Sequence, residues 1–256
     1  MIALRKLLMD NAPADALQAM HDSGELSKFL PELENLDIHD NHSHKHKNNF
    51  LHSLQVLRQA IAMESAPDLV LRTAALLHDI GKFDTRDFTE DGAPTFTLHE
   101  VVGARQAAKL LRDHGYSKDE IEAIRELITN HMRAFNFDEN QWGDSAVRRL
   151  IADSSTELQL RRLFVIFKAD LTTKNKMKRD KIRANLDKLQ ARVLQVKEAD
   201  ALAKRRPAVD GHRLMAEFGL SQGRELGAVM KFLNSEDGLK LSEEEALQKA
   251  REILGR

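Results

Sequence analysis

The sequence predicts an almost entirely α-helical protein, organised as one large domain or two small ones. Among its 256 residues only 12 are glycine and 5 are proline, and aromatic residues make up 5%. Alanine, leucine, glutamate, lysine and arginine, which favour helices, are abundant. Apolar residues recur at the three- and four-residue spacing of helices through most of the chain. A chain of this length buries a sizeable core, so we expect a stable fold.

The composition excludes several functional classes. With 39 basic and 40 acidic residues the formal charge is -1, so nucleic acid can be attracted only by a local patch. Cysteine is absent, which excludes disulfides and thiolate sites and leaves 11 histidines with the carboxylates as metal ligands. The N-terminus is too polar for a signal peptide, and no apolar run reaches the roughly 20 residues of a spanning helix. We expect a cytoplasmic protein without membrane contact.

The N-terminal region, residues 1–47, is predicted to contain packing helices and a polar loop. Over residues 1–30 one or two short amphipathic helices are expected, with an apolar stripe at Leu4, Leu7, Leu8, Leu17 and Met20. The loop that follows contains four closely spaced histidines, His39, His42, His44 and His46. Metal binding by a flexible loop costs conformational entropy, so the role of these histidines stays open.

The next two predicted helices each bring a histidine towards the interior. Over residues 48–63 the apolar stripe consists of Leu51, Leu54, Leu57 and Ile61, with His52 beside it. Asp68 is the expected N-cap of the second helix, whose apolar stripe continues into His78. Asp79 follows directly, and Gly81 is expected to stop this helix. An isolated His-Asp pair of this kind favours a hydrogen-bonded core histidine over a metal ligand.

Two further predicted helices repeat this pattern after an irregular segment. Residues 83–97 lose periodicity, and Asp91-Gly92 indicates a tight turn in a loop or small hairpin. A helix over 98–114 has His99 in its first turn, and Gly103 would let a neighbouring element approach closely. Ser117 and Glu120 form a predicted capping box for a helix whose apolar stripe ends in His131.

The remaining segments contribute one carboxylate and one basic cluster. After a short helix near residues 144–151, Thr156 opens a helix whose buried stripe leads to Asp170. A carboxylate in that position has a high desolvation cost unless a cation meets it. A basic cluster follows at Lys174, Lys176, Lys178, Arg179, Lys181 and Arg183. It is either a solvated helix face or a local contact for an RNA backbone.

A long amphipathic helix closed by Pro207 and three short helices complete the chain, the last opened by a capping box at Ser242. We therefore expect N-terminal helices in residues 1–47, a helical core in 48–176, and a smaller helical region in 177–256.

Six potential metal ligands recur at inward positions of different predicted elements: His52, His78, Asp79, His99, His131 and Asp170. Hydrogen-bonded core residues explain one or two such groups, but six would each require a buried partner. Imidazoles and carboxylates without thiolates suit manganese, iron, cobalt, nickel, zinc or magnesium. Metal-dependent catalysis is the working hypothesis.

The order of these residues, with the run Leu77-His78-Asp79-Ile80-Gly81-Lys82, resembles the HD superfamily of metal-dependent phosphohydrolases. The resemblance implies a primary metal set of His52, His78, Asp79 and Asp170. It matches His99 and His131 to the additional histidines of members that hold a second metal, with Asp79 bridging the two ions. One or two divalent ions are therefore the expected cofactors.

The stretch from about residue 48 to 256 also resembles the C-terminal part of bacterial tRNA nucleotidyltransferases, the CCA-adding enzymes that carry an HD domain. The segments 210–215 and 219–227 are similar to their helical region after the HD core. Only about 50 residues precede His52, and no Gly-Ser followed by paired aspartates is found. We therefore expect an HD module without a nucleotidyltransferase head.

The resemblance implies hydrolysis of phosphomonoester or cyclic or linear phosphodiester bonds in nucleotides or RNA ends, with Asp79 and Lys82 as the catalytic residues. Lys82 is the first choice for a phosphate contact, although a surface role is nearly as well supported. Arg86 and Arg133, in loops beside the pocket, are further substrate contacts. The leaving-group acid stays open between His44, His46 and water. Two alternatives are an RNA- or tRNA-binding module with a structural metal site, and a hydrolase of nucleoside mono- or triphosphates.

Overall fold

A computed structural model describes residues 4–37, 48–135, 137–138 and 141–256. The histidine-rich loop with His39, His42, His44 and His46 lies outside these described residues. The chain divides into two compact units, Met1–Val193 and Leu194–Arg256. The predicted segments 1–47 and 48–176 both fall within the first unit. The all-α prediction is confirmed, since the described residues form helices with a single short hairpin.

The first unit begins with more and shorter helices than predicted. These are α1 (Leu4–Leu8), α2 (Pro13–Asp22), α3 (Leu26–Phe29) and α4 (Pro31–Glu34). Pro13 and Pro31 each open a new helix, where the missing amide hydrogen costs nothing. Gly24 adopts a positive φ of 75° in the turn between α2 and α3. These residues divide the predicted amphipathic stretch into separate helices.

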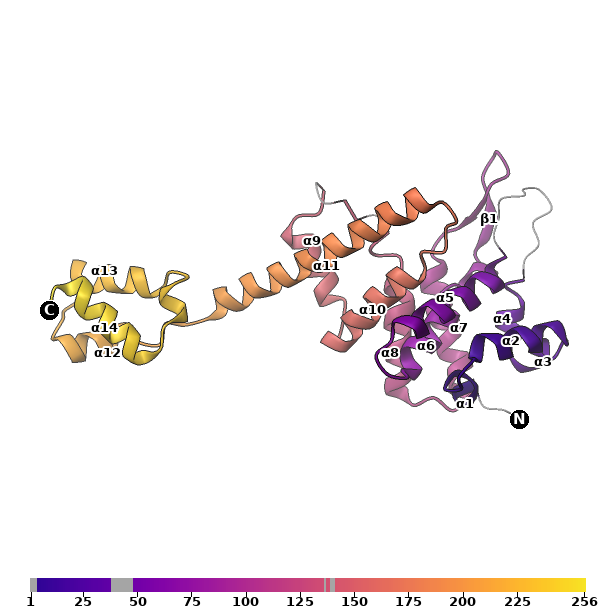
Figure 1. Ribbon diagram of the computed structural model, residues 1–256, viewed down its shortest axis with the longest axis horizontal. Helices are drawn as coiled ribbons and strands as arrows, with labels where there is room; N and C mark the ends of the chain where they lie inside the picture. Colours follow the sequence, from indigo (N-terminus) through magenta and orange to yellow (C-terminus); the bar gives the residue numbers. More distant parts are fainter. Residues whose placement is uncertain (1–3, 38–47, 136, 139–140) are drawn as a thin grey trace. The chain divides into compact units, whose positions relative to one another are not determined.

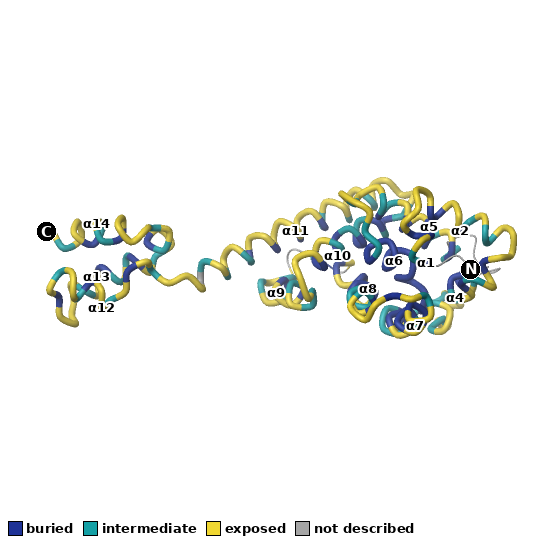
Figure 2. The backbone as a smooth tube through the Cα atoms, turned by 90° about the horizontal axis from the view of Figure 1, so that it is seen from below, coloured by how far each residue is buried: buried dark blue, intermediate teal, exposed yellow. Residues whose placement is uncertain are grey.

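The core of the first unit is built around α6 (Leu69–Leu77), in which every residue from Val70 to Leu77 is buried. It packs against α5 (Asn49–Met63), α8 (Lys118–Asn130) and α10 (Glu157–Ala169), as Figure 1 shows. Helix α7 (His99–Asp113) packs against α8. Figure 2 shows this buried interior beneath exposed outer faces. The central helix therefore ends inside the protein, where a polar residue is shielded from water.

The structure confirms the predicted N-terminal caps of α6 and α8. The Asp68 side chain accepts from the amide of Leu71, and Ser117 forms the predicted capping box with Glu120. The predicted buried stripe of α5 is wrong at Leu51, whose side chain is 49% exposed. Phe50, Ser53 and Leu54 are buried in its place, so the helix is rotated and His52 lies beside the core.

A short 3-10 turn and a hairpin connect α6 to α7. The turn η1 (Ile80–Lys82) follows α6, and β1 (Arg86–Phe88) pairs antiparallel with β2 (Pro94–Phe96). The predicted hairpin is thereby confirmed. Gly81 does not stop α6 as predicted, because the helix already ends at Leu77. A Cβ atom at Gly81 would lie 2.2 Å from the carbonyl oxygen of His99, so this glycine permits close packing against α7.

The first unit is completed by α9 (Asp144–Ala152) and by the beginning of α11 (Lys176–Lys204). Leu186, Leu189 and Val193 are the buried residues of α11 within this unit. The described residues contain no helix that combines the length and apolar character needed to cross a bilayer.

The second unit has a separate small core. Helices α12 (Gly211–Phe218), α13 (Arg224–Leu233) and α14 (Glu243–Leu254), with the 3-10 turn η2 (Gly238–Lys240), confirm the three predicted short helices. The buried residues that cluster in this core are Val209, Leu214, Val229, Leu233, Ala246 and Ala250. The predicted capping box at Ser242 is present.

Candidate metal centre

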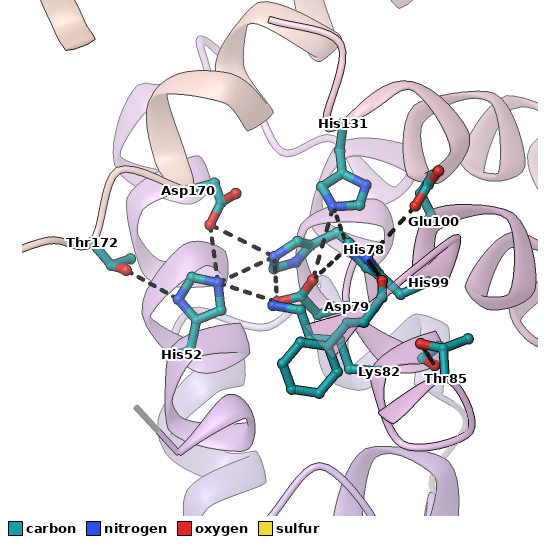
Figure 3. Close-up of polar contacts among 12 residues, drawn as sticks. His52, His78, Asp79, Lys82, Thr85, His99, Glu100, His131, Asp170 and Thr172 are labelled. Carbon is teal, nitrogen blue, oxygen red and sulfur yellow. Dashed lines mark hydrogen bonds and ion pairs between the residues drawn. The ribbon is translucent and has the colours of Figure 1, made fainter. Parts of the chain in front are cut away.

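The six predicted ligand residues lie together at one place in the first unit (Figure 3). Their donor atoms form two groups, each with all atoms within 4.8 Å of one another. The first group contains His52, His78 and Asp170, and the second contains Asp79, His99 and His131. Residues separated by more than a hundred positions in the chain therefore meet at one polar centre.

Most of these side chains lie at the ends of helices that point towards the centre. His78 is the C-cap of α6, His131 is the C-cap of α8, and Asp170 is the C-cap of α10. In each helix an apolar stripe packs into the core and leads to the polar residue at its end. Hydrophobic packing therefore places the ligands, and the surrounding core shields them.

Close backbone packing brings His99 to Asp79. A Cβ atom at Gly103 would lie 3.0 Å from the backbone nitrogen of Gly81, so two glycines face each other where η1 meets α7. The predicted close approach at Gly103 is confirmed, and its partner is this 3-10 turn. As a result, His99 Nε2 lies 3.3 Å from Asp79 Oδ1.

All four imidazoles are held through Nδ1 and direct Nε2 towards the centre. Three Nδ1 atoms lie next to backbone carbonyls: His78 at 3.0 Å from Ala75, His99 at 2.8 Å from Phe96, and His131 at 2.6 Å from Ile128. Since a carbonyl only accepts, these Nδ1 atoms carry the hydrogen, and Nε2 of the neutral ring has a free lone pair. This tautomer is the one that ligates a metal through Nε2.

The Nε2 atoms face one another in pairs. His99 and His131 approach to 3.2 Å, and His52 and His78 to 3.3 Å. Two acceptor nitrogens at such distances repel unless a cation, either a proton or a metal ion, lies between or beside them. The arrangement of the Nε2 atoms therefore favours a bound positive charge at the centre.

The two carboxylates supply negative charge to this cluster. Asp170 Oδ1 lies 2.9 Å from His52 Nε2 and 3.8 Å from His78 Nε2. Asp79 reaches both groups, because its Oδ2 lies 3.4 Å from His52 and 3.2 Å from His78 while its Oδ1 faces His99 and His131. One carboxylate thus joins the two halves of the centre.

The pKa shifts of His52 and Asp79 agree with a centre that stabilises cations. Burial lowers the pKa of His52, but hydrogen bonds to Asp170 and Asp79 outweigh burial and raise it from 6.5 to about 9. Burial also opposes ionisation of Asp79, yet His78 and Lys82 hold the pKa of this carboxyl well below its ordinary value. Burial and the neighbouring His78 lower the pKa of His131 to about 4, which keeps that ring neutral at pH 7.

The donor set fits one or two divalent ions. Ligands placed about 2.1 Å from an ion in octahedral or tetrahedral geometry stand roughly 3.0–3.4 Å apart. The paired Nε2 atoms at 3.2 and 3.3 Å match this spacing. With imidazole and carboxylate donors and no cysteine in the chain, first-row transition metals are the best match.

Of the three predicted substrate contacts, the structure places only Lys82 at this centre. Its Nζ lies 2.6 Å from Asp79 Oδ2 and 5.5 Å from the ring centre of Phe96. Arg86 lies in β1 rather than in a loop, with its guanidinium 5.0 Å from the Phe88 ring centre. Arg133 pairs with Asp153. The structure describes neither arginine in contact with the six ligand residues.

Sequence reasoning missed the groups that orient the imidazoles. Thr172 Oγ1 lies 3.1 Å from His52 Nδ1 and holds that ring. Its position two residues after Asp170 was the available signal. The sequence signal for the carbonyls of Ala75 and Ile128 was clearer. Each of these residues lies three positions before its histidine, which is the spacing of a helical turn.

A helical core that gathers histidines and aspartates at its helix ends defines a class of all-α domains with a buried site for divalent metal. A match to the HD domain family covers residues 49–204, more than half of the chain. The chain belongs to the HD domain family, as its ligand order predicted.

Curated relatives extend this similarity into the C-terminal region. The chain is 29% identical over 232 residues to a CC-adding tRNA nucleotidyltransferase of Thermus thermophilus, covering 90% of the chain and 50% of the relative. It is 27% identical over 238 residues to an A-adding tRNA nucleotidyltransferase of Deinococcus radiodurans, covering 90% and 52%. The chain thus spans about half the length of these two relatives.

A second kind of relative matches a smaller share of the chain. The chain is 30% identical over 173 residues to a bifunctional uridylyltransferase/uridylyl-removing enzyme of Ruegeria pomeroyi, covering 60% of the chain and 17% of that protein. The similarity therefore connects the chain to proteins named for tRNA nucleotide addition and for uridylyl removal.

Proposed function

We propose that this protein is a metal-dependent phosphohydrolase that cleaves phosphomonoester or cyclic or linear phosphodiester bonds in nucleotides or RNA ends. The observation that carries the proposal is the convergence of four Nε2 atoms and two carboxylates, with each Nδ1 directed outward. HD-family membership and the uridylyl-removing relative support hydrolysis. The tRNA nucleotidyltransferase relatives support RNA as the substrate class.

In this proposal His52, His78, Asp79, His99, His131 and Asp170 hold one or two divalent ions of manganese, iron, nickel, cobalt or zinc, with magnesium as the hard-ion alternative. A bound ion would acidify water to supply the nucleophile and would neutralise charge on the phosphoryl oxygens. The chain's own contribution is orientation, because the Nδ1 hydrogen bonds fix the rings before any ion binds.

Asp79 and Lys82 are the proposed catalytic residues. Asp79 is almost fully buried and contacts imidazoles of both groups, so it sets the spacing of the centre. The Lys82 ammonium lies beside it and is 19% exposed, which supports a contact with a phosphoryl oxygen that enters from solvent. Arg86 and Arg133 are weaker proposed substrate contacts, and Arg133 would first have to leave Asp153.

The test is metal content together with hydrolysis of bis(p-nitrophenyl) phosphate, a generic diester, by wild type and His78→Ala. We expect wild type to retain divalent metal after dialysis and the variant to lose at least 100-fold in kcat/KM, as expected when metal chemistry is removed. His212→Ala, an exposed histidine of the second unit, is the matched control. A metal-free wild type or full activity in His78→Ala would overturn the proposal.

Two alternatives predict different outcomes in a substrate screen. A binding module with a structural metal site, which the basic cluster at 174–183 favours, would hold metal but hydrolyse nothing. A nucleotide hydrolase would act on free mono- or triphosphates and not on RNA. Nucleotides, 2',3'-cyclic nucleotides and short RNAs with defined 3' ends, each assayed with several metals, separate these activities.

A further inference from the structure

A basic cavity of about 570 Å³ lies in the first unit, between α5, the end of α10 and the beginning of α11. Four cationic side chains line it, and the described lining residues include no carboxylate. These cations are Lys168, Lys174, Arg179 and Arg183. Its volume falls within the roughly 300–1,000 Å³ range of sites for small organic ligands, which includes nucleotides.

The cavity adjoins the metal centre through two chain segments. Thr172 lines the cavity and also contacts His52 Nδ1 at 3.1 Å. On α5, Gln55 and Gln59 follow His52 at three- and four-residue steps, so these side chains lie on one side of the helix. A ligand that enters the centre beside His52 therefore has this cavity next to it.

The charges in the cavity are poorly neutralised by the protein. Lys168 is paired with Asp187 at 2.9 Å. Lys174, Arg179 and Arg183 form no ion pair within the described part of the chain. Arg179 and Arg183 also stand four residues apart on α11, a spacing at which like charges destabilise a helix. An anionic ligand would relieve this repulsion and supply the missing counter-charge.

We infer that this cavity binds the nucleotide adjacent to the scissile phosphate, with Arg179 and Arg183 on its phosphate group. The inference rests on the proposed function and narrows the substrate to an RNA strand end rather than a free mononucleotide. The amides of Gln55 and Gln59 and the hydroxyl of Thr173 supply neutral hydrogen-bonding groups for the sugar and base. Planar guanidinium groups suit a phosphate through paired hydrogen bonds.

The test compares wild type with the double variant Arg179→Gln/Arg183→Gln. Affinity for a fluorescein-labelled single-stranded hexaribonucleotide is measured by anisotropy at several salt concentrations, which needs no catalysis. We expect at least about tenfold weaker binding, and a slope of log K against log salt that is shallower by about 1.4 for two lost phosphate contacts. The double variant should also lose its preference for the longer substrate. We expect kcat/KM for the hexamer, divided by kcat/KM for a 2',3'-cyclic mononucleotide, to fall about tenfold.

A matched control removes the same charge elsewhere. Arg105 and Lys109 stand four residues apart on the exposed side of α7, and Arg105→Gln/Lys109→Gln should bind the hexamer as wild type does. A second comparison, Lys178→Gln/Lys181→Gln, removes exposed charges of the same basic cluster that do not line the cavity. Equal losses in this variant would indicate a diffuse basic face and overturn the assignment to the cavity.

The remaining outcomes separate this inference from the proposed function. Wild-type binding by Arg179→Gln/Arg183→Gln overturns the inference even if hydrolysis is found. Weaker binding without hydrolysis of any phosphoester by wild type supports the cavity as an RNA site and rejects the phosphohydrolase. If only nucleoside triphosphate hydrolysis responds to the double variant, the second phosphate comes from a triphosphate chain and the RNA assignment is wrong.

Discussion

The histidines of the centre are fixed by backbone groups before a ligand arrives. His99 and His131 illustrate this, since carbonyls of Phe96 and Ile128 hold their Nδ1 atoms while their Nε2 atoms lie 3.2 Å apart. Fixing a ring in advance removes the entropy cost of ordering it upon ligation. The centre therefore has the rigidity expected of a site built for an ion.

Removing one histidine of the second group should reduce the metal content without abolishing it. In His99→Asn the group formed with Asp79 and His131 loses one of its three ligands, while His52, His78 and Asp170 remain. We expect bound metal to fall from two ions per chain to one, measured by mass spectrometry of the dialysed protein. Loss of all metal would show that a single ion uses ligands from both groups.

The only tyrosine gives a pH-dependent probe of the core. Burial raises the pKa of Tyr116 from 10.0 to about 12, although its hydrogen bond to Thr73 opposes this shift. Because the unfolded hydroxyl ionises near pH 10 and the folded one near 12, the unfolded state loses its proton first. The contribution of Tyr116 to the free energy of unfolding is therefore fully present below pH 10. It decreases by up to about 3 kcal/mol as the pH rises through 12.

Tyrosinate absorbance near 295 nm measures this titration directly, since Tyr116 is the sole tyrosine. Its midpoint should lie near 12 in the folded protein and near 10 in urea. Tyr116→Phe should remove the pH dependence attributed to this residue and cost about 1 kcal/mol for the lost hydrogen bond. A folded midpoint near 10 would contradict the burial of this hydroxyl.

At the residue scale the sequence identified polar side chains that interrupt or end apolar stripes. His78, His131 and Asp170 were recognisable for this reason, because a buried polar group needs a partner. The orientation of Arg133 towards Asp153 was not predictable, since both residues are polar, neither is buried, and nothing in their spacing pairs them. The cavity residues of α5 and α11 were equally hidden, because only tertiary packing brings them together.

At the element scale, the contact between η1 and α7 controls the position of His99 and Asp79. A Cβ atom at Gly81 would lie 2.2 Å from a backbone oxygen, which requires the elements to move apart. At Gly103 the nearest contact would be 3.0 Å, close to what a small adjustment accommodates. These two glycines therefore differ in how strictly they are required.

Gly81→Ala should destabilise the protein by about 3 kcal/mol and reduce metal affinity, because it separates His99 from Asp79. Gly103→Ala should have a smaller effect, since gained helix propensity of about 0.5–1 kcal/mol offsets part of the strain. Gly227→Ala is the helical control, with no atom within 4 Å of its added Cβ. Urea unfolding measures the free energy of unfolding of each variant. Equal values for Gly81→Ala and Gly103→Ala would contradict the prediction.

Element boundaries that depend on capping were predictable, whereas the rotation of α5 was not. Ser117 and Ser242 open their helices through local hydrogen bonds that the sequence encodes within four residues. Leu51 is exposed and Phe50 buried because α5 must fit α6 and α10 together. Apolar periodicity alone does not choose between two adjacent stripes when both contain large hydrophobic residues.

At the scale of the whole molecule, the two units have separate cores, and among the described residues the groups that could hold a metal lie in the first unit. A ligand stabilises the part of a protein that binds it. Calorimetry of the full chain should therefore show two transitions, of which a chelator lowers only one. At metal concentrations about 100 times the Kd, the stabilisation of about 2.7 kcal/mol corresponds to a shift of roughly 5–10 °C.

His78→Ala is the control for this measurement, because loss of one ligand of the first group should reduce the effect of the chelator on its thermal profile. A single transition that moves as a whole would show that the units unfold together. A chelator-sensitive second unit would place an ion outside the centre described above.

Asp79 presents one oxygen to His52 and His78 and the other to His99 and His131. Because the carboxylate is one rigid plane, an ion that turns it in one half also turns the oxygen available to the other half. The affinities of the two halves are consequently linked, and the linkage is reciprocal. A titration of the apoprotein with metal should then deviate from the binding curve of two independent sites. The metal that occupies one half should also change the metal affinity of the other half.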